Sequence, residues 1–294
     1  MTATGIEIVK QPGCWRKAAS LAGAVDGMLP QPGARVAVVG CGTSWFIAEA
    51  YARLREAAGH GETDAWAASE FPYQRDYDAL LAITRSGTTT EVLELLDRTE
   101  GKLPRTVILA DATSPAAVPA NEVVALGFAD EKSVVQTVFA TTTLALLRAQ
   151  LGEDVAALAD AADDALGGDL PGEWIQAEQI TFLGSGFAHG IAREAALKCR
   201  EAAQLWTESY PTCEYRHGPV SIAAPGRLVW QFGGDEAGLQ TEVEATGATF
   251  VENGLDPMVD LVLAQRLAVA IAEARGLDPD QPRNLTRSVI LDRS

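Results

Sequence analysis

The sequence predicts an α/β protein made of two tandem, doubly wound parallel-sheet sandwiches, with a helical lead-in before them and an extended tail after them. Short apolar strands alternate with helical stretches along the chain, which is typical of parallel α/β folds. One strand–glycine–helix pattern also occurs twice. Gly40 and Gly42 match Gly184 and Gly186, 144 positions further on. A repeat of this kind indicates two sandwiches of one type.

The first half of the chain is expected to hold a lead-in at 1–33 and a first sheet domain at 34–166. Pro30, Pro32 and Gly33 close the lead-in, which is expected to contain one short helix at 14–28. The expected elements of the first domain are a strand at 35–40, a helix at 45–58, a weaker strand at 65–68, a strand at 80–84, a helix from 91, strands at 106–110 and 122–126, and a long helix at 135–150.

A glycine-rich link at 167–172 is expected to separate this domain from a second one at 173–294. The expected elements of the second domain are a strand at 180–183, a helix at 191–210, strands at 228–232 and 248–251, and a helix at 258–275. The helix at 191–210 is predicted because this stretch contains neither Pro nor Gly. The tail at 280–294 is polar, and no helix is expected there.

Composition restricts the partners. The formal net charge of −17 and the pI of about 4.6 argue against nucleic acid and anionic membranes, because both require basic surface. The first ten residues lack the apolar core of a signal peptide, and no apolar run is long enough to span a bilayer. Cys14, Cys41, Cys199 and Cys213 show no metal-ligand spacing. A soluble, cytoplasmic protein with reduced thiols and neither metal nor cofactor is therefore expected.

Two hydroxyl-rich turns predict a site for an anion. One contains Gly42, Thr43 and Ser44, and the other contains Thr84, Arg85, Ser86, Gly87 and Thr89. Each turn follows a strand and opens a helix, so their hydroxyl and N–H groups are expected to converge at the carboxyl edge of one sheet. Arg85 adds a guanidinium that can bind an anion bidentately. The alternative is that Ser44 and Thr89 are ordinary helix N-caps.

Charged residues on one helix predict proton-transfer chemistry. Glu194, Lys198 and Glu201 are spaced i, i+4 and i+7, which places them on one stripe. A carboxylate held in a cleft can act as a proton shuttle near neutral pH. The alternative is an exposed ladder of salt bridges, which is what such spacing usually forms.

His217 is the third candidate. It stands in a turn between Arg216 and Gly218, where an exposed imidazole can be presented to a ligand. A single histidine has a structural role more often than a catalytic one, and this alternative stays open.

Taken together, these stretches resemble the double sugar isomerase (SIS) domain proteins, in particular the isomerase half of glucosamine-6-phosphate synthase. The resemblance extends over nearly the whole chain. The matching segments are residues 40–44, 85–91, 131–137, 194–201, 214–219 and 280–289.

The resemblance implies roles for individual residues. Ser44, Thr84, Ser86 and Thr89 would hold a 6-phosphate, and the match also includes Ser133 as a substrate-binding residue. Glu201 would move a proton between C1 and C2 of the open sugar, Lys198 and Glu194 would orient and balance it, and His217 would assist ring opening. In the family this histidine comes from the neighbouring subunit, which implies a homodimer with composite sites.

Two departures from the synthases matter. The sequence shows no glutaminase domain ahead of the isomerase half, so a stand-alone enzyme is expected. Arg287 stands where the synthases have a lysine that can form a Schiff base, and a guanidinium stays protonated, so only a charge contact to the sugar is expected from it.

The expected function is therefore a sugar-6-phosphate aldose–ketose isomerase or an amino-sugar-6-phosphate deaminase. Both use the same proton transfer, and the sequence does not separate them. The alternatives are an isomerase for a sugar with another C6 anion, such as a sulfonate, and a non-catalytic sugar-phosphate-binding regulator.

Overall fold

The computed structural model describes residues 2–234 and 238–291, and the remaining residues of the predicted tail, 292–294, lie outside the described part. The chain forms two compact units. The first-sheet unit comprises residues 13–132, 138–156 and 286–291, and the second-sheet unit comprises residues 2–12, 133–137 and 157–285. The sequence boundaries at 34–166 and 173–294 follow the chain, whereas these units exchange short segments.

The first sheet has five parallel strands in the order β2-β1-β3-β4-β5. The strands are β1 (Val36–Gly40), β2 (Thr63–Ala67), β3 (Ala79–Ile83), β4 (Arg105–Leu109) and β5 (Glu122–Ala125). The chain order reverses between β1 and β3, which makes this pair the topological switch point of the sheet. All five strands were predicted to within two residues.

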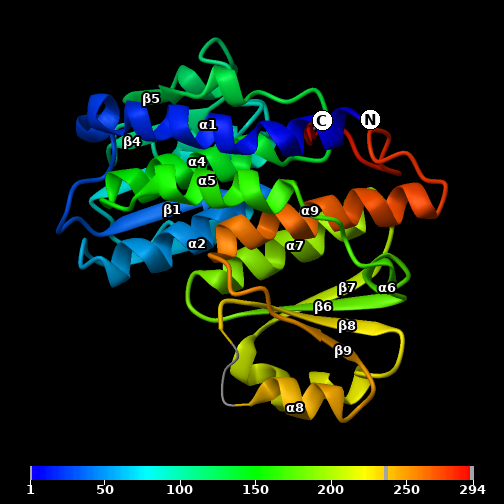
Figure 1. Ribbon diagram of the computed structural model, residues 1–294. Coiled ribbons are helices and arrows are strands. Elements are labelled where there is room, and N and C mark those ends of the chain that lie inside the picture. The colour runs from blue at the N-terminus through cyan, green and yellow to red at the C-terminus, as the bar shows by residue number, and fades with distance from the viewer. Residues whose placement is uncertain (1, 235–237, 292–294) are drawn as a thin grey trace. The chain divides into compact units, whose positions relative to one another are not determined.

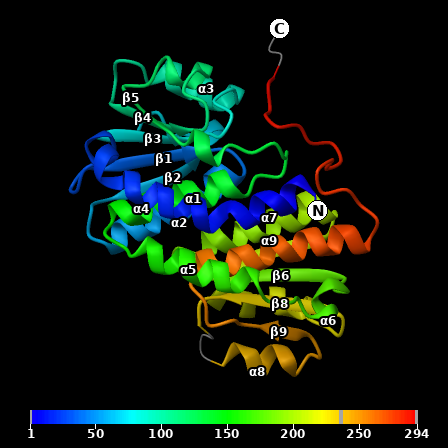
Figure 2. The same ribbon diagram turned by 45° about the horizontal axis from the view of Figure 1, so that its top comes forward.

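Helices cover both faces of the first sheet (Figure 2). α2 (Thr43–Ala57) and α4 (Val138–Gln150) lie on one face, and α3 (Thr90–Arg98) lies on the other. Val92, Leu95 and Leu96 of α3 pack on the apolar side chains of the β strands. α4 begins at Val138 rather than at the predicted 135, because the Glu131 carboxylate accepts the first N–H groups of the helix there.

The second sheet has four parallel strands in the order β7-β6-β8-β9. The strands are β6 (Gln179–Gly184), β7 (Trp206–Pro211), β8 (Arg227–Phe232) and β9 (Thr249–Val251). α7 (Ala188–Ala203) and α9 (Pro257–Ala274) lie on one face, and α8 (Leu239–Glu244) lies on the other (Figure 1). The α/β class with two helix-covered parallel sheets is thus confirmed.

The shorter elements complete the chain. They are α5 (Val155–Leu166), α6 (Gly172–Ile175) and the 3-10 turns η1 (Asp26–Met28), η2 (Ala68–Glu70), η3 (Pro115–Ala117), η4 (Gly127–Ala129), η5 (Thr212–Arg216) and η6 (Pro219–Ile222). The sequence did not predict α5 or α8.

The predicted helix at 191–210 was wrong beyond Ala203. Gln204 adopts a left-handed conformation with φ of 51°, and the N–H groups of Gln204 and Leu205 both bond back to the Cys199 carbonyl, so a left-handed residue ends the helix. The chain then forms strand β7, whose aromatic and β-branched residues pair with β6. β7 is therefore an edge strand that lies within the range predicted to be helical.

The first helix was also predicted wrongly. α1 runs over Ala3–Val25 rather than over 14–28, and it contains Pro12. Ile8, Trp15 and Ala18 are buried at helical spacing, so one apolar stripe continues through the proline. The Asp280 carboxylate accepts hydrogen bonds from the N–H groups of Ala3 and Thr4, which caps the helix from 277 positions away. Such a cap leaves no local signal in the sequence.

The repeated glycines perform the same task in both units. A Cβ atom at Gly40 would lie 2.6 Å from the Ser44 backbone, and one at Gly184 would lie 2.4 Å from the Ala188 carbonyl oxygen. Gly42 and Gly186 turn the chain with φ of 54° and 58°. The weak internal repeat is therefore a repeat of backbone geometry: a central strand, a glycine turn and a closely packed helix.

Candidate functional site

The candidate residues fall into two halves, one in each unit, and the first half is the pair of hydroxyl-rich turns in the first-sheet unit. β1 and β3 are adjacent parallel strands, so the turns that follow them lie side by side at the switch point. Thr43 and Ser44 occupy the first turn of α2, and both are buried, as is Thr84 after β3. The sheet thus brings together the two turns that the sequence predicted to bind an anion.

The second of these turns, residues 84–90, is held in shape by its own hydrogen bonds. The Gly87 N–H donates to the Thr84 hydroxyl at 3.3 Å, and the Thr88 N–H donates to the Ser86 hydroxyl at 3.2 Å. Gly87 has φ of 63°, and a Cβ atom there would lie 1.9 Å from the Ser114 Oγ. Only glycine fits this position, so Gly87 shapes the turn.

The two hydroxyls that were candidates for capping do not cap. The N-cap of α2 is Gly42, which places Ser44 inside the helix. Thr89 is the N-cap residue of α3, but its side chain makes no capping hydrogen bond. Neither hydroxyl therefore acts as the helix N-cap that the alternative interpretation predicted.

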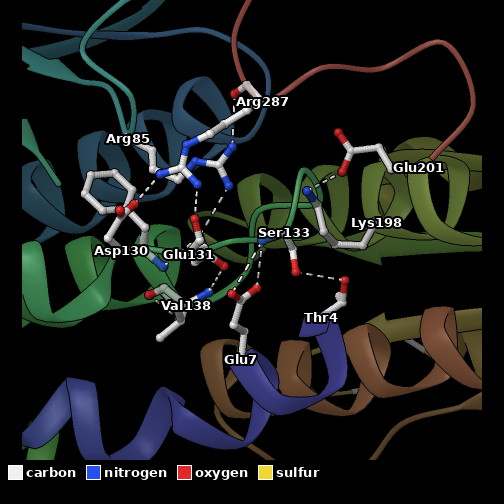
Figure 3. A network of polar contacts seen from close by, with 12 residues as sticks. Thr4, Glu7, Arg85, Asp130, Glu131, Ser133, Val138, Lys198, Glu201 and Arg287 are labelled. Atoms are coloured by element: carbon white, nitrogen blue, oxygen red, sulfur yellow. Dashed lines mark hydrogen bonds and ion pairs between the residues drawn. The ribbon is translucent and has the colours of Figure 1, made fainter. Parts of the chain in front are cut away.

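The two predicted cations of this half both face acidic residues (Figure 3). The buried Arg85 guanidinium lies 3.8 Å from the Glu131 carboxylate and donates to the Arg287 carbonyl at 3.0 Å. The Arg287 guanidinium donates to the Asp130 carboxylate and to the Glu131 carbonyl. Each guanidinium thus has a counter-charge within the protein.

Ser133, predicted to bind substrate, belongs to the second-sheet unit. It is buried, its hydroxyl accepts from the Thr4 hydroxyl at 3.2 Å, and its N–H faces the Glu7 carboxylate at 3.4 Å (Figure 3). In this structure Ser133 thus connects the start of α1 to the segment before α4.

The second half of the candidate residues is the charged row on α7, in the second-sheet unit. The Lys198 ammonium lies 3.4 Å from the Glu194 carboxylate. It lies 2.5 Å from the Glu201 carboxylate (Figure 3). The side chains of Glu194 and Lys198 are 0% and 1% exposed, whereas that of Glu201 is 18% exposed. The row is therefore not an exposed ladder of salt bridges. Two of its members are buried, and Glu201 is the one that reaches solvent.

Glu201 borders a pocket of about 510 Å³. The lining also includes Arg200, Gln204, Trp206, Arg283 and Asn284, all of the same unit. Trp206 is 75% exposed at the start of β7, so the pocket combines an aromatic face with guanidinium and amide groups. A small polar molecule can thus approach the Glu201 carboxylate from solvent.

His217 lies at the end of η5, before Gly218, whose φ is 130°. Its side chain is exposed, and its N–H donates to the Glu214 carbonyl at 3.0 Å. The turn presents the imidazole to solvent, as the sequence predicted.

The cysteines near both halves are neutral thiols. Burial, followed by the nearby Glu91 carboxylate, raises the pKa of Cys41 to about 11. Burial raises the pKa of Cys199 on α7 to about 12. All four cysteines are free, and the raised pKa values keep the thiols of Cys41 and Cys199 protonated near neutral pH.

Residues 2–234 and 238–291 contain no candidate metal-binding cluster and no candidate membrane-spanning helix. No three His, Cys, Asp or Glu side chains gather there as ligands for a metal ion. No helix in these ranges has the length and apolar character needed to cross a membrane.

The sequence comparison finds relatives among aminotransferases. The chain is 26% identical over 327 residues to the glutamine–fructose-6-phosphate aminotransferase [isomerizing] of a Nostoc species, covering 88% of this chain and 52% of that protein. The chain thus spans about half the length of the curated relatives it matches. No protein-family model matches it.

The structural comparison finds the same architecture in known crystal structures. Glucosamine-6-phosphate deaminase from Thermotoga maritima superposes with a TM-score of 0.85 at 25% identity, covering 99% of this chain and 100% of that one. Tagatose-6-phosphate ketose/aldose isomerase from Escherichia coli superposes with a TM-score of 0.81 at 20% identity, covering 100% and 97%. The resemblance to the double SIS domain proteins is confirmed by both comparisons.

Sequence reasoning missed two residues of the first half. Asp130 binds Arg287, and Ser288 contacts the turn at 84–90 through its hydroxyl. Asp130 precedes the segment at 131–137 and Ser288 lies within the one at 280–289, but contacts between segments so distant in the chain have no local pattern.

Proposed function

We propose that the protein is an enzyme that acts on a sugar carrying an anion at C6, either as an aldose–ketose isomerase or as an amino-sugar-phosphate deaminase. The observation that carries the proposal is the row on α7, in which a partly exposed Glu201 is hydrogen bonded to an otherwise buried Lys198–Glu194 pair. An acid that is paired with a buried cation and is open to a pocket is a candidate for a functional group. The names of the relatives and the structural neighbours support the same class of reaction.

The anion is assigned to the turns of the first-sheet unit. The hydroxyls of Ser44, Thr84, Ser86 and Thr89 and nearby N–H groups are the proposed donors. Neutral donors at a helix N-terminus bind phosphate through hydrogen bonds and the helix dipole. This matters here because the net charge of −17 repels an anion at long range, so binding must come from short-range donors.

The proton transfer is assigned to Glu201. Its carboxylate takes the proton from C2 of the open-chain aldose and returns it to C1, through an enediol or, for an amino sugar, an enolamine. The amino sugar then becomes a ketose imine, which water hydrolyses to the ketose and ammonia. The Lys198 ammonium stabilises the negative charge that develops on the oxygen at C1, and Glu194 holds Lys198 in place.

His217 is proposed to assist ring opening in a neighbouring copy of the chain. Its exposure and its position in a turn support this assignment. Mixed dimers test it: inactive E201Q and inactive H217A, unfolded and refolded together, should regain activity because one composite site in the heterodimer is intact. No recovery in a dimeric mixture would contradict the shared site.

The proposal is tested by assaying the pure protein with glucosamine 6-phosphate, following both ammonia and ketose, with fructose 6-phosphate in the reverse direction. E201Q should lose about 10²- to 10⁴-fold in turnover while binding the sugar phosphate with unchanged affinity. E178Q is the matched control, since Glu178 is an exposed acid of the same unit.

The other outcomes separate the alternatives. Binding of the sugar phosphate without turnover by the wild type would indicate a regulator. Turnover of a 6-sulfonate sugar in preference to the phosphate would indicate another C6 anion.

A further inference from the structure

The C-terminal tail lies across the turn at 84–90. The hydroxyls of Ser86 and Thr88 donate to the Ser288 Oγ at 3.2 and 2.9 Å. The Thr90 N–H donates to the Val289 carbonyl at 3.2 Å, and the Leu291 N–H donates to the Thr90 hydroxyl at 2.9 Å. The tail thus meets the same hydroxyl-rich turn that is proposed to receive the anion.

The tail is anchored by a ring of charged groups on three segments (Figure 3). Arg85 donates to the main-chain carbonyl of Arg287, and the side chain of Arg287 donates to Asp130 and to the carbonyl of Glu131. The Glu131 carboxylate faces Arg85 and also accepts the N–H of Val138 at 2.7 Å, which fixes it at the start of α4. The ring therefore connects the tail to the turn after β3 and to α4.

The two ion pairs of this ring differ in burial. The side chains of Arg85 and Glu131 are 3% and 0% exposed, so their pair is a fixed part of the unit. Those of Arg287 and Asp130 are 38% and 45% exposed, and pairs so accessible to water are weak. A planar guanidinium can donate hydrogen bonds to two acceptors at once, and a lysine ammonium does this less well. Arg287 therefore has the properties of a releasable latch.

We propose that Arg287 is a positioning residue that latches the tail across the turn at 84–90, so that the Ser288 hydroxyl joins the groups that receive the anion of the ligand. Arg287 does not itself bind the sugar. This inference rests on the proposed function only for the identity of the ligand, because the latch is defined by contacts within the free protein.

The latch is tested by amide hydrogen exchange of Thr90 and Leu291 in the full chain without ligand, since both amides bond across the tail contact. R287A should speed their exchange about tenfold, and R287K, which keeps the charge but loses the fork, about threefold. D130N should behave like R287K. The matched control is R75A, because Arg75 and Asp64 form a pair of similar exposure, 47% and 38%, that does not contact the tail. Unchanged exchange in R287A would overturn the latch.

Inorganic phosphate tests the contribution of Ser288. It should slow the exchange of both amides in the wild type, and less so in S288A. Unchanged or faster exchange would mean that the tail excludes the anion, which overturns this part of the proposal.

Turnover keeps the two proposals distinguishable. If the proposed function holds, R287A should raise KM about tenfold with kcat changed less than about threefold, and R287K should recover part of the loss. An equal loss of kcat would overturn the positioning role. If the variants change amide exchange as predicted but the wild-type protein turns over no sugar phosphate, the proposed function is refuted and the latch stands.

Discussion

The two strand–glycine–helix frames share a backbone and differ in chemistry. In the first, the turn after β1 carries Thr43 and Ser44, and helix α2 has Ala50, Leu54 and Ala57 at the positions offset by 144 from the charged row. In the second, α7 carries that row, Glu194, Lys198 and Glu201, while Phe187 and Ala188 replace the hydroxyls of the turn. At these equivalent positions, the hydroxyls occur in the first copy and the ionisable groups in the second. Under the proposed function, the duplicated frame divides binding and proton transfer between its copies.

The largest effect is expected from removing the cation of the row. K198M removes the cation 3.4 Å from the buried Glu194 carboxylate and should lower the free energy of unfolding by about 3–5 kcal/mol. L54M, at the equivalent position of α2, exchanges one apolar side chain for another and should cost less than about 1.5 kcal/mol. Urea unfolding of both variants measures the difference, and equal losses would contradict the distinction between the two helices.

The shared backbone frame is tested by placing a methyl group at the close approach. G40A and G184A should each lower the free energy of unfolding by about 1–3 kcal/mol, because the new Cβ meets helix backbone rather than a movable side chain. G13A is the control, since a Cβ atom at this exposed helical position has open space. A tolerated substitution at only one of the two sites would show that the frames are not equivalent.

The division of hydroxyl groups predicts an asymmetric effect on binding. S44A should weaken the affinity for a sugar phosphate about tenfold, because one donor to the anion is lost. A188S, which adds a hydroxyl at the equivalent position of the other turn, should leave affinity unchanged. Calorimetric titration measures both, and a loss confined to A188S would reverse the assignment of the anion to the first frame.

A smaller, pH-dependent change in the free energy of unfolding is expected from a buried acid of the second-sheet unit. Burial raises the pKa of Asp260 on α9 to about 7, although hydrogen bonds from Trp230 and Asn253 partly oppose the shift. Because the folded-state pKa lies above the usual 3.8, the folded state binds more protons between these values, and stability falls as pH rises through this window.

D260N lacks this titration. Between about pH 5 and pH 6, the wild type should therefore lose about 1 kcal/mol more unfolding free energy than D260N. The unfolding curves of both proteins at the two pH values give the comparison. Parallel pH dependence in the two proteins would mean that Asp260 titrates normally.

Most of the fold could be predicted from local signals. The strands before the glycine turns are apolar runs with clear ends, and the resemblance gave the architecture. The mistakes concern long-range contacts: Asp280 caps α1 across 277 positions, and β7 forms because its residues pair with β6. Helical spacing predicted the row on α7, but the engagement of Arg85 and Arg287 by Glu131 and Asp130 depends on tertiary contacts that spacing does not encode.

The central claim, that Glu201 moves a proton between the first two carbons of a C6-anionic sugar, is tested most directly by solvent deuterium exchange. Glucosamine 6-phosphate and fructose 6-phosphate are incubated with the protein in D₂O, and the recovered sugars are analysed for deuterium at C1 and C2. The account predicts incorporation with the wild type and with E178Q, and at least about 100-fold slower incorporation with E201Q at unchanged ligand affinity. Incorporation by E201Q at the wild-type rate, or none with the wild type while the sugar is bound, would contradict it.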